Sequence, residues 1–241
     1  MEFAIDQALE IYSGGLGFLT GSHMRSAHDL GQHMVGIGML WKLGYYDQGR
    51  NEDQTLCVDW QQKLYAYLED TGITFTVNIH GADVWVKAYY LPPYVFGSAP
   101  LYLLTTDFAE NDEVSRTISY RLYDGNTATK LAQYMVLGIG GGKLLDLLGY
   151  DAEVYHLNEA HALPVAFHLH NDKAEVHKRL VFTTHTPEEA GNEKHPFDLC
   201  LEMGYFGGLS KAVVQEATGI YDDSFNLSLA ALRLAKGERG V

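Results

Sequence analysis

The residues best suited to chemistry begin with a glycine-rich loop, Tyr12-Ser13-Gly14-Gly15-Leu16-Gly17, which leads into a segment with helical spacing from Leu19 to Leu30. Glycines let the backbone adopt positive φ and approach a ligand closely. The first turn of a helix presents unpaired N–H groups at the positive end of the helix dipole. This combination predicts a site for an anion such as phosphate. A tight turn packed against a neighbouring strand could use the same residues, and the loop alone leaves that alternative open.

A second group of polar residues stands at the carboxyl ends of two predicted strands: Asn158 and Glu159 follow residues 151–157, and His185 and Thr186 follow residues 179–184. Ligands of open α/β sheets gather at such strand ends, so we interpret these residues as candidates for a site. Taken singly, His185 is more often a buried histidine, and Glu159 is more often an acid stabilised by a helix N-terminus. Their shared position favours the functional interpretation.

The elements expected to position these residues alternate along the chain. Strands are predicted over residues 35–41, 73–79, 84–90, 101–107, 151–157 and 179–184, with a hairpin turn at His80-Gly81-Ala82-Asp83. Helices are predicted over residues 131–148 and 159–169, and a loop from Pro187 leads into residues 197–203. Residues 47–59 are polar and predict a loop. Alternating strands and helices are typical of an α/β fold in which helices cover a parallel sheet.

Four glycines interrupt the long apolar segment that ends at Gly149: Gly138, Gly140, Gly141 and Gly142. Their spacing imitates a dinucleotide-binding fingerprint, but they lie inside a helical pattern and not directly after a strand. Glycine weakens a helix, so we expect these glycines to let another element pack closely.

Composition excludes several classes of protein. The 241 residues are 46% hydrophobic and carry a formal net charge of -14, which disfavours nucleic acid or an anionic membrane surface as a partner. Cys57 and Cys200 form no CxxC motif, so neither a disulfide scaffold nor a cysteine zinc site is predicted. No run approaches the roughly 20 apolar residues of a membrane span, and no basic leader is visible. We therefore expect a cytoplasmic protein.

Histidines are concentrated in one part of the sequence, at positions 156, 161, 168, 170 and 177. Spacings of five and two residues do not place two imidazoles together on one face of a helix, as zinc sites of the HExxH type require. We therefore predict no metal site.

Several motifs in order carry a family resemblance. They are the glycine loop with Gly21-Ser22-His23-Met24-Arg25, Val35-Gly36-Ile37-Gly38, Gly44-Tyr45-Tyr46-Asp47-Gln48, Arg121-Leu122-Tyr123, Leu137-Gly138-Ile139-Gly140-Gly141, His156-Leu157-Asn158-Glu159-Ala160-His161, Thr183-Thr184-His185-Thr186-Pro187 and Phe225-Asn226-Leu227. In this order the chain resembles the N-terminal domain of the α-glucan (glycogen, starch or maltodextrin) phosphorylases. The resemblance covers nearly the whole chain.

The resemblance implies a fold, a reaction and a cofactor. Residues 1–241 would form the N-terminal Rossmann-like half of a GT-B glycosyltransferase fold with an inserted β-hairpin region, incomplete at both ends. The family cleaves α-1,4-glucans with inorganic phosphate and releases glucose 1-phosphate with retention of configuration. Pyridoxal phosphate acts there through its phosphate group, and its lysine belongs to the C-terminal half, which has no counterpart here. We expect this chain alone to be inactive. Together with its missing half it would bind an α-glucan or maltooligosaccharide. A second copy, in a homodimer, is a possible further partner.

The resemblance also assigns roles to individual residues. The catalytic residues would be His185, which touches the reacting glucosyl unit, and Thr186 beside it. Substrate or phosphate binding falls to Glu2, Gly14, Gly15, Leu16, Gly17, Asn158, Glu159 and His161. Fixed donors and acceptors suit sugar hydroxyls, and partial negative charge near the anomeric carbon stabilises an oxocarbenium-like state. Residues 124–126 correspond to the acceptor-side loop, which is short here.

Two other functions are compatible with the sequence. A non-catalytic glucan-binding or regulatory module would use the 16 tyrosines and 3 tryptophans for sugar stacking, although the same residues suit a core. A nucleotide-sugar-dependent glucan synthase shares the fold and a Gly-Gly-Leu loop. That family usually has a lysine before the glycines, where this chain has Ser13.

Overall fold

The computed structural model describes residues 1–172, 176–185 and 188–235. The chain divides into two compact units. The first comprises Met1–Phe75 and Trp85–Asn126, and the second comprises Thr76–Val84 and Thr127–Val241. The fold is mixed α/β, as the alternation of elements predicted. Across the described ranges, none of the helices is both long and apolar enough to span a membrane.

A four-stranded sheet runs in the order β1-β6-β5-β4, with β1 at Gly36–Met39, β4 at Glu69–Ile79, β5 at Ala82–Leu91 and β6 at Leu101–Thr105. Strands β1 and β6 are parallel, whereas β5 and β6 are antiparallel. His80 and Gly81 have φ of 51° and 77°, values that suit the tight turn between β4 and β5. A turn this short joins only antiparallel strands. The predicted hairpin is thus confirmed, and the predicted parallel sheet is in fact mixed, with β1 and β6 as its parallel pair.

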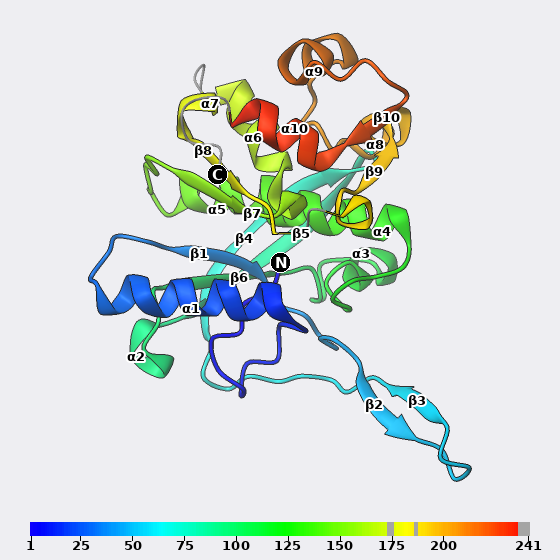
Figure 1. Ribbon diagram of the computed structural model, residues 1–241. Coiled ribbons are helices and arrows are strands. Elements are labelled where there is room, and N and C mark those ends of the chain that lie inside the picture. The colour runs from blue at the N-terminus through cyan, green and yellow to red at the C-terminus, as the bar shows by residue number, and fades with distance from the viewer. Residues whose placement is uncertain (173–175, 186–187, 236–241) are drawn as a thin grey trace. The chain divides into compact units, whose positions relative to one another are not determined.

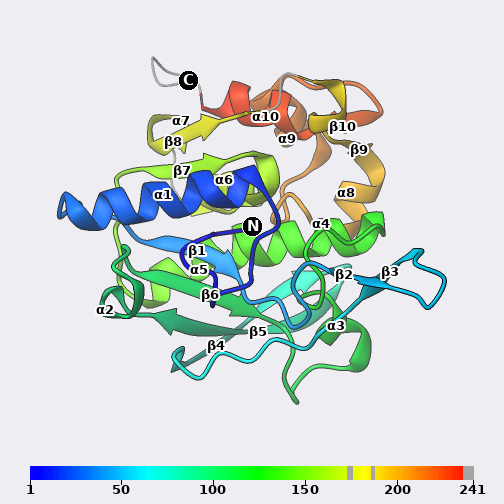
Figure 2. The ribbon, with the colours of Figure 1, turned by 60° about the horizontal axis from the view of Figure 1, so that its bottom comes forward.

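Helix α1, Gly15–Asp29, lies beside β1 in the first unit (Figure 2). It begins at the glycine loop itself, four residues before the predicted start, because Gly14 is extended and serves as the N-cap. A Cβ atom on Gly36 would stand 2.7 Å from Met24 Cε and 2.8 Å from Leu101 Cδ1. The absence of a side chain on Gly36 therefore lets α1 and the sheet approach closely.

The segment predicted as a polar loop over residues 47–59 instead forms an antiparallel hairpin, which extends away from the sheet of the first unit (Figure 1). Its strands are β2, Asp47–Arg50, and β3, Leu56–Asp59. The Asp53 carboxylate accepts from the Thr55 amide at 3.0 Å, and Gln54 has φ of 67°. Local turn chemistry closes this hairpin although the strands lack apolar alternation. Two short helices complete the first unit, α2 at Pro93–Phe96 and α3 at Glu113–Thr117.

The long glycine-containing helix of the second unit is continuous but changes its winding. Helix α4, Thr127–Met135, passes through a π-helical turn, η1 at Val136–Gly140, into α5 at Gly141–Leu147. A Cβ on Gly138 would meet the Ala162 carbonyl oxygen and the Val165 amide nitrogen, both at 2.8 Å. The prediction that these glycines serve close packing is confirmed at this position.

The remaining elements of the second unit are β7 at Tyr155–Asn158, η2 at Ala160–Ala162, α6 at Pro164–Asp172, α7 at Val176–Arg179, β8 at Leu180–Thr183, η3 at Glu189–Gly191, β9 at Lys194–Pro196, α8 at Phe197–Met203, α9 at Lys211–Thr218, β10 at Ser224–Asn226 and α10 at Leu227–Leu234. Strands β7 and β8 are parallel, and β9 and β10 are antiparallel. Its core is an aromatic cluster of Phe167, Phe197, Tyr205, Phe206 and Phe225. Edge-to-face contacts among these rings fix the helices that surround β7 and β8.

Candidate functional site

In the first unit, the Glu2 carboxylate lies against the glycine loop. Only 2% of Glu2 is exposed, and its Oε2 atom accepts from the backbone N–H of Ser13 at 2.7 Å and of Gly14 at 3.4 Å. The Tyr123 hydroxyl donates to Oε1. A buried carboxylate needs such donors, and the N-terminal end of α1 adds a favourable dipole. Glu2 is therefore part of the loop's structure and not a solvated terminal residue.

The glycine loop keeps further amides beyond those that Glu2 uses. Among the described residues, none accepts a hydrogen bond from the N–H groups of Gly15, Leu16 or Gly17, which form the first turn of α1. A Cβ on Gly15 would meet nothing within 4 Å, whereas a Cβ on Gly17 would stand 2.6 Å from Tyr12 Cβ. Gly15 is exposed, whereas Gly17 is buried and packs against Tyr12. These three amides are suited to bind an anion.

Tyr123 is a residue that sequence reasoning did not select for the site. Besides its bond to Glu2, it has φ of 61°, a conformation that costs free energy in any residue but glycine. Its ring meets Tyr45 edge-on, with centroids 6.5 Å apart. A bond between positions 2 and 123 leaves no local pattern in the sequence, so only the Arg-Leu-Tyr motif could have drawn attention to it.

In the second unit, β7 and β8 bring their carboxyl ends together, with Asn158 opposite Thr183. The Glu159 carboxylate accepts from the His185 amide at 2.6 Å and from the Thr184 hydroxyl at 3.2 Å. Glu159 is 8% exposed and has φ of 61° and ψ of 172°. Strain of this kind is concentrated at functional sites in proteins. Here the strained backbone of Glu159 directs its carboxylate from the end of β7 toward the segment that follows β8.

Asn158 and His185 form a second link between the same strand ends. The Asn158 Oδ1 atom and His185 Nε2 are 2.7 Å apart. Because an amide oxygen only accepts, His185 Nε2 donates in this contact and Nδ1 points away from Asn158. Both His185 and Thr184 are exposed, in contrast to Glu159. The His185 imidazole is therefore exposed to solvent in a fixed orientation, and the buried Glu159 carboxylate holds the backbone that carries it.

The remaining predicted residues of this group differ in their surroundings. His161 follows in η2, with its ring 5.2 Å from the Tyr134 ring, and its Nδ1 atom is closed to solvent. Burial lowers the pKa of His161 to about 3, so the imidazole is neutral at pH 7. Thr186 lies outside the described residues. The structure thus brings Asn158, Glu159 and His185 into direct contact.

A partly buried acid near this group was also missed from the sequence. Glu193 accepts from Lys130 Nζ at 3.0 Å and from the Tyr134 hydroxyl at 2.9 Å, and its Oε2 lies 3.2 Å from His195 Nε2. Burial acts to raise the pKa of this carboxyl, but the hydrogen bonds from His195, Lys130 and Tyr134 outweigh it and lower the pKa to about 2. Glu193 therefore carries a charge at pH 7 and holds α4 to the segment before β9.

The described residues hold no group of three or more His, Cys, Asp or Glu side chains arranged to bind a metal ion. What they offer is hydrogen-bonding chemistry: open amides at a helix N-terminus in one unit, and an oriented imidazole beside an amide side chain in the other. The first suits a phosphate, and the second suits the hydroxyl groups of a sugar.

No protein-family model matches the sequence. Over its whole length, however, the chain is similar to α-glucan phosphorylases, and the predicted resemblance is confirmed. It is 33% identical to the maltodextrin phosphorylase of Thermococcus litoralis, over 97% of this chain and 30% of that protein. It is 34% identical to the glycogen phosphorylase of Aquifex aeolicus, over 98% of this chain and 37% of that protein.

An uncharacterized protein of Methanocaldococcus jannaschii is more similar, with 44% identity over all of this chain and 46% of its own length. The chain therefore spans between about a third and just under half of the length of the curated relatives it matches.

Proposed function

We propose that this chain is the N-terminal part of an α-1,4-glucan phosphorylase, a retaining glycosyltransferase of the GT-B type that acts in the cytoplasm. The observation that carries the proposal is the match of 97–98% of the chain to relatives named maltodextrin and glycogen phosphorylase. Two structural features support it: the open amides at the start of α1 and the oriented His185. Under this proposal, phosphate and glucan are the substrates of the complete enzyme.

In this proposal the first unit holds phosphate groups. The backbone amides of Gly15, Leu16 and Gly17 have no acceptor among the described residues, so they fit the phosphate of a substrate or of pyridoxal phosphate. When bound, that cofactor would supply a phosphate group that exchanges protons with the substrate phosphate. Its lysine would come from sequence outside these 241 residues.

The second unit would contact the sugar. Asn158 and His185 offer a fixed set of donors and acceptors for hydroxyl groups, and the His185 carbonyl would favour positive charge that develops at the anomeric carbon. Glu159 would act through the backbone of His185, because its carboxylate already accepts the His185 amide. His161, neutral at pH 7, would serve as a hydrogen-bonding and packing group.

The test is complementation. The chain is mixed with a polypeptide that supplies the remaining part of a phosphorylase, and glucose 1-phosphate is measured with maltodextrin and inorganic phosphate present. We expect product only from the mixture, and we expect His185→Ala to remove it while the two polypeptides still associate. Association of the wild-type halves without product would contradict the proposal.

A binding titration separates the proposed enzyme from a glucan-binding module. Saturable binding of maltooligosaccharides by the 241-residue chain, together with inactive complemented mixtures, would favour the module instead.

A further inference from the structure

A cavity in the first unit is separate from the residues discussed so far. It has a volume of about 230 Å³ and lies where the parallel strands β1 and β6 end. Its lining residues are Leu40, Trp41, Lys42, Gln62, Lys63, Leu64, Tyr65, Leu68, Tyr89, Thr105 and Asp107. Since ligands of open α/β sheets bind at the carboxyl ends of parallel strands, this position is itself suited to a ligand.

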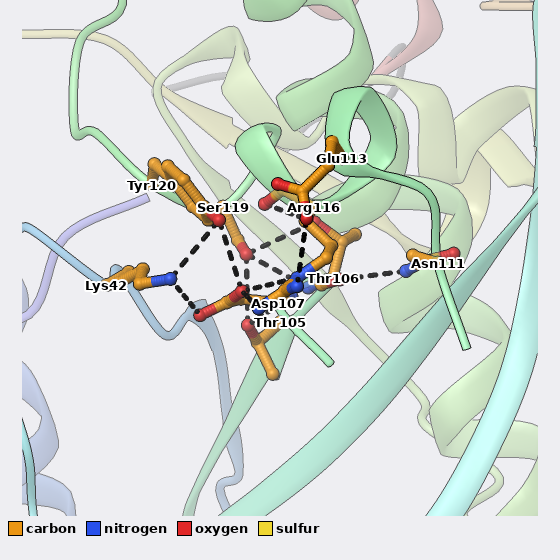
Figure 3. A network of polar contacts seen from close by, with 9 residues as sticks. All are labelled: Lys42, Thr105, Thr106, Asp107, Asn111, Glu113, Arg116, Ser119 and Tyr120. Carbon is orange, nitrogen blue, oxygen red and sulfur yellow. Dashed lines mark hydrogen bonds and ion pairs between the residues drawn. The ribbon is translucent and has the colours of Figure 1, made fainter. Parts of the chain in front are cut away.

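Polar side chains at the end of β6 and in the segments that follow β1 and β6 meet at one side of the cavity. Lys42 Nζ lies 3.0 Å from Asp107 Oδ2 and donates to the Tyr120 hydroxyl at 3.2 Å. The Thr105 hydroxyl lies 2.9 Å from the hydroxyl of the buried Ser119. Figure 3 shows Lys42, Thr105 and Asp107 within one continuous network that also includes Arg116. These contacts hold the polar groups at the cavity in fixed positions.

The charges around the cavity are already balanced. Asp107 pairs with Lys42 and with Arg116 at 2.9 Å. Lys63 pairs with Glu10 and, at 3.2 Å, with Asp47. With the Arg116 guanidinium counted, three carboxylates face three cationic groups, so no net positive charge is left here to attract an anion. The electrostatics therefore favour an uncharged ligand over phosphate or a carboxylate.

The lining nevertheless keeps hydrogen-bonding capacity. An ammonium group has three donors, and the described contacts use two on Lys42 and two on Lys63. Gln62, which is exposed, adds an amide with both donors and an acceptor. The partly exposed side chains of Tyr89, Tyr65 and the lining leucines supply apolar walls. Aromatic surface combined with fixed polar groups is suited to a ligand that carries both C–H faces and hydroxyls.

We propose that this cavity binds a neutral polyhydroxylated molecule the size of a single sugar residue. Its volume of about 230 Å³ lies below the roughly 300–1,000 Å³ of pockets that hold drug-sized ligands and suits a single ring. The site does not depend on the proposed phosphorylase function, because it shares no residue with the glycine loop or with the ends of β7 and β8.

The experiment uses the 241-residue chain and two-dimensional NMR, in which shift changes report where a ligand binds. The probes are D-glucose, myo-inositol and, at constant ionic strength, inorganic phosphate. We expect glucose or inositol to produce saturable shift changes at the backbone amides of Leu64 and Thr105, which line the cavity, with a dissociation constant below about 10 mM.

A matched pair of variants locates the site. Gln62 lines the cavity, whereas its neighbour Gln61 does not and instead donates to Asp59 at 2.6 Å. We expect Gln62→Leu to weaken polyol binding about fivefold or more and Gln61→Leu to leave it unchanged. Lys42→Met should weaken it as well, and loss of the Thr105 signals would reveal a folding defect in that variant.

Three results would overturn the proposal: no saturable shift change with either polyol, equal affinity in the Gln62 and Gln61 variants, or saturation of the cavity by phosphate in preference to glucose. Each is independent of the complementation assay. An active phosphorylase with a cavity that binds nothing would refute this inference alone.

Discussion

The Glu159 carboxylate accepts the backbone N–H of His185 at 2.6 Å, so a side chain at the end of β7 fixes the backbone that follows β8. Glu159 holds this position at φ of 61° and ψ of 172°, a region that is natural only for glycine. The bond and the strain act in opposite directions on stability. Two substitutions at the same position separate them.

Glu159→Ala should lower the free energy of unfolding by about 1–3 kcal/mol, because it leaves the His185 amide without its acceptor and keeps the backbone strain. Glu159→Gly also removes the carboxylate but relieves the strain. We expect the glycine variant to be more stable than the alanine variant by about 1 kcal/mol, measured by urea denaturation. In both variants the His185 amide resonance should shift. Equal stabilities would mean that the positive φ carries no cost.

The packing of α1 against the N-terminal segment gives a second prediction. A Cβ on Gly21 would stand 2.0 Å from the Ala4 carbonyl oxygen and 2.5 Å from its carbon, so Gly21→Ala must displace the backbone that carries Glu2. We expect it to destabilise the chain by about 1–3 kcal/mol.

Gly15→Ala is the matched control, because the added methyl group meets nothing within 4 Å. Its stability should stay within about 0.5 kcal/mol of the wild type. Thermal unfolding of the two variants checks both values, and equal melting temperatures would contradict the packing seen at Gly21.

Local sequence patterns predicted the elements that depend on local rules. The turn at His80 and Gly81, the strand that becomes β6 and the glycine-containing helix were all confirmed, since turn chemistry, apolar runs and helical spacing are written within a few residues. The hairpin of β2 and β3 was missed because its exposed strands carry no apolar alternation.

The site was less predictable because its bonds join distant residues. Tyr123 reaches Glu2 across 121 positions, and Lys130 reaches Glu193 across 63. Asn158 and His185 were predicted as site residues because each lies at the end of a strand, and the two strands were expected to be parallel neighbours. Glu159 was expected to bind substrate, whereas its support of the His185 backbone depends on a hydrogen bond across 26 residues that no local pattern encodes.

His161 should make stability depend on pH in the mildly acidic range. Burial lowers its pKa to about 3 from an ordinary value near 6.5, so the unfolded chain binds a proton at a pH where the folded chain does not. The free energy of unfolding should therefore fall as pH decreases below about 6.5 and stop changing on this account near pH 3. His161→Gln should flatten the pH 4–6.5 part of the curve. A variant curve parallel to that of the wild type would show that His161 titrates normally.

Glu193 should act at lower pH and in the same direction. Its pKa of about 2 lies below the ordinary 4.5, so its contribution is complete above about pH 4.5 and is lost as pH falls toward 2. The lowered pKa stabilises the folded state, and solvent screening reduces this effect because the side chain is 28% exposed. We therefore expect the charged carboxylate to contribute about 2 kcal/mol to the free energy of unfolding. Glu193→Gln should be less stable than the wild type by that amount at pH 7, since an amide pairs poorly with Lys130. The difference should vanish near pH 2, where the wild-type carboxyl is also neutral. Urea denaturation of both proteins at pH 7, 4 and 2.5 measures the convergence, and a constant difference at all three would assign the loss to packing instead of charge.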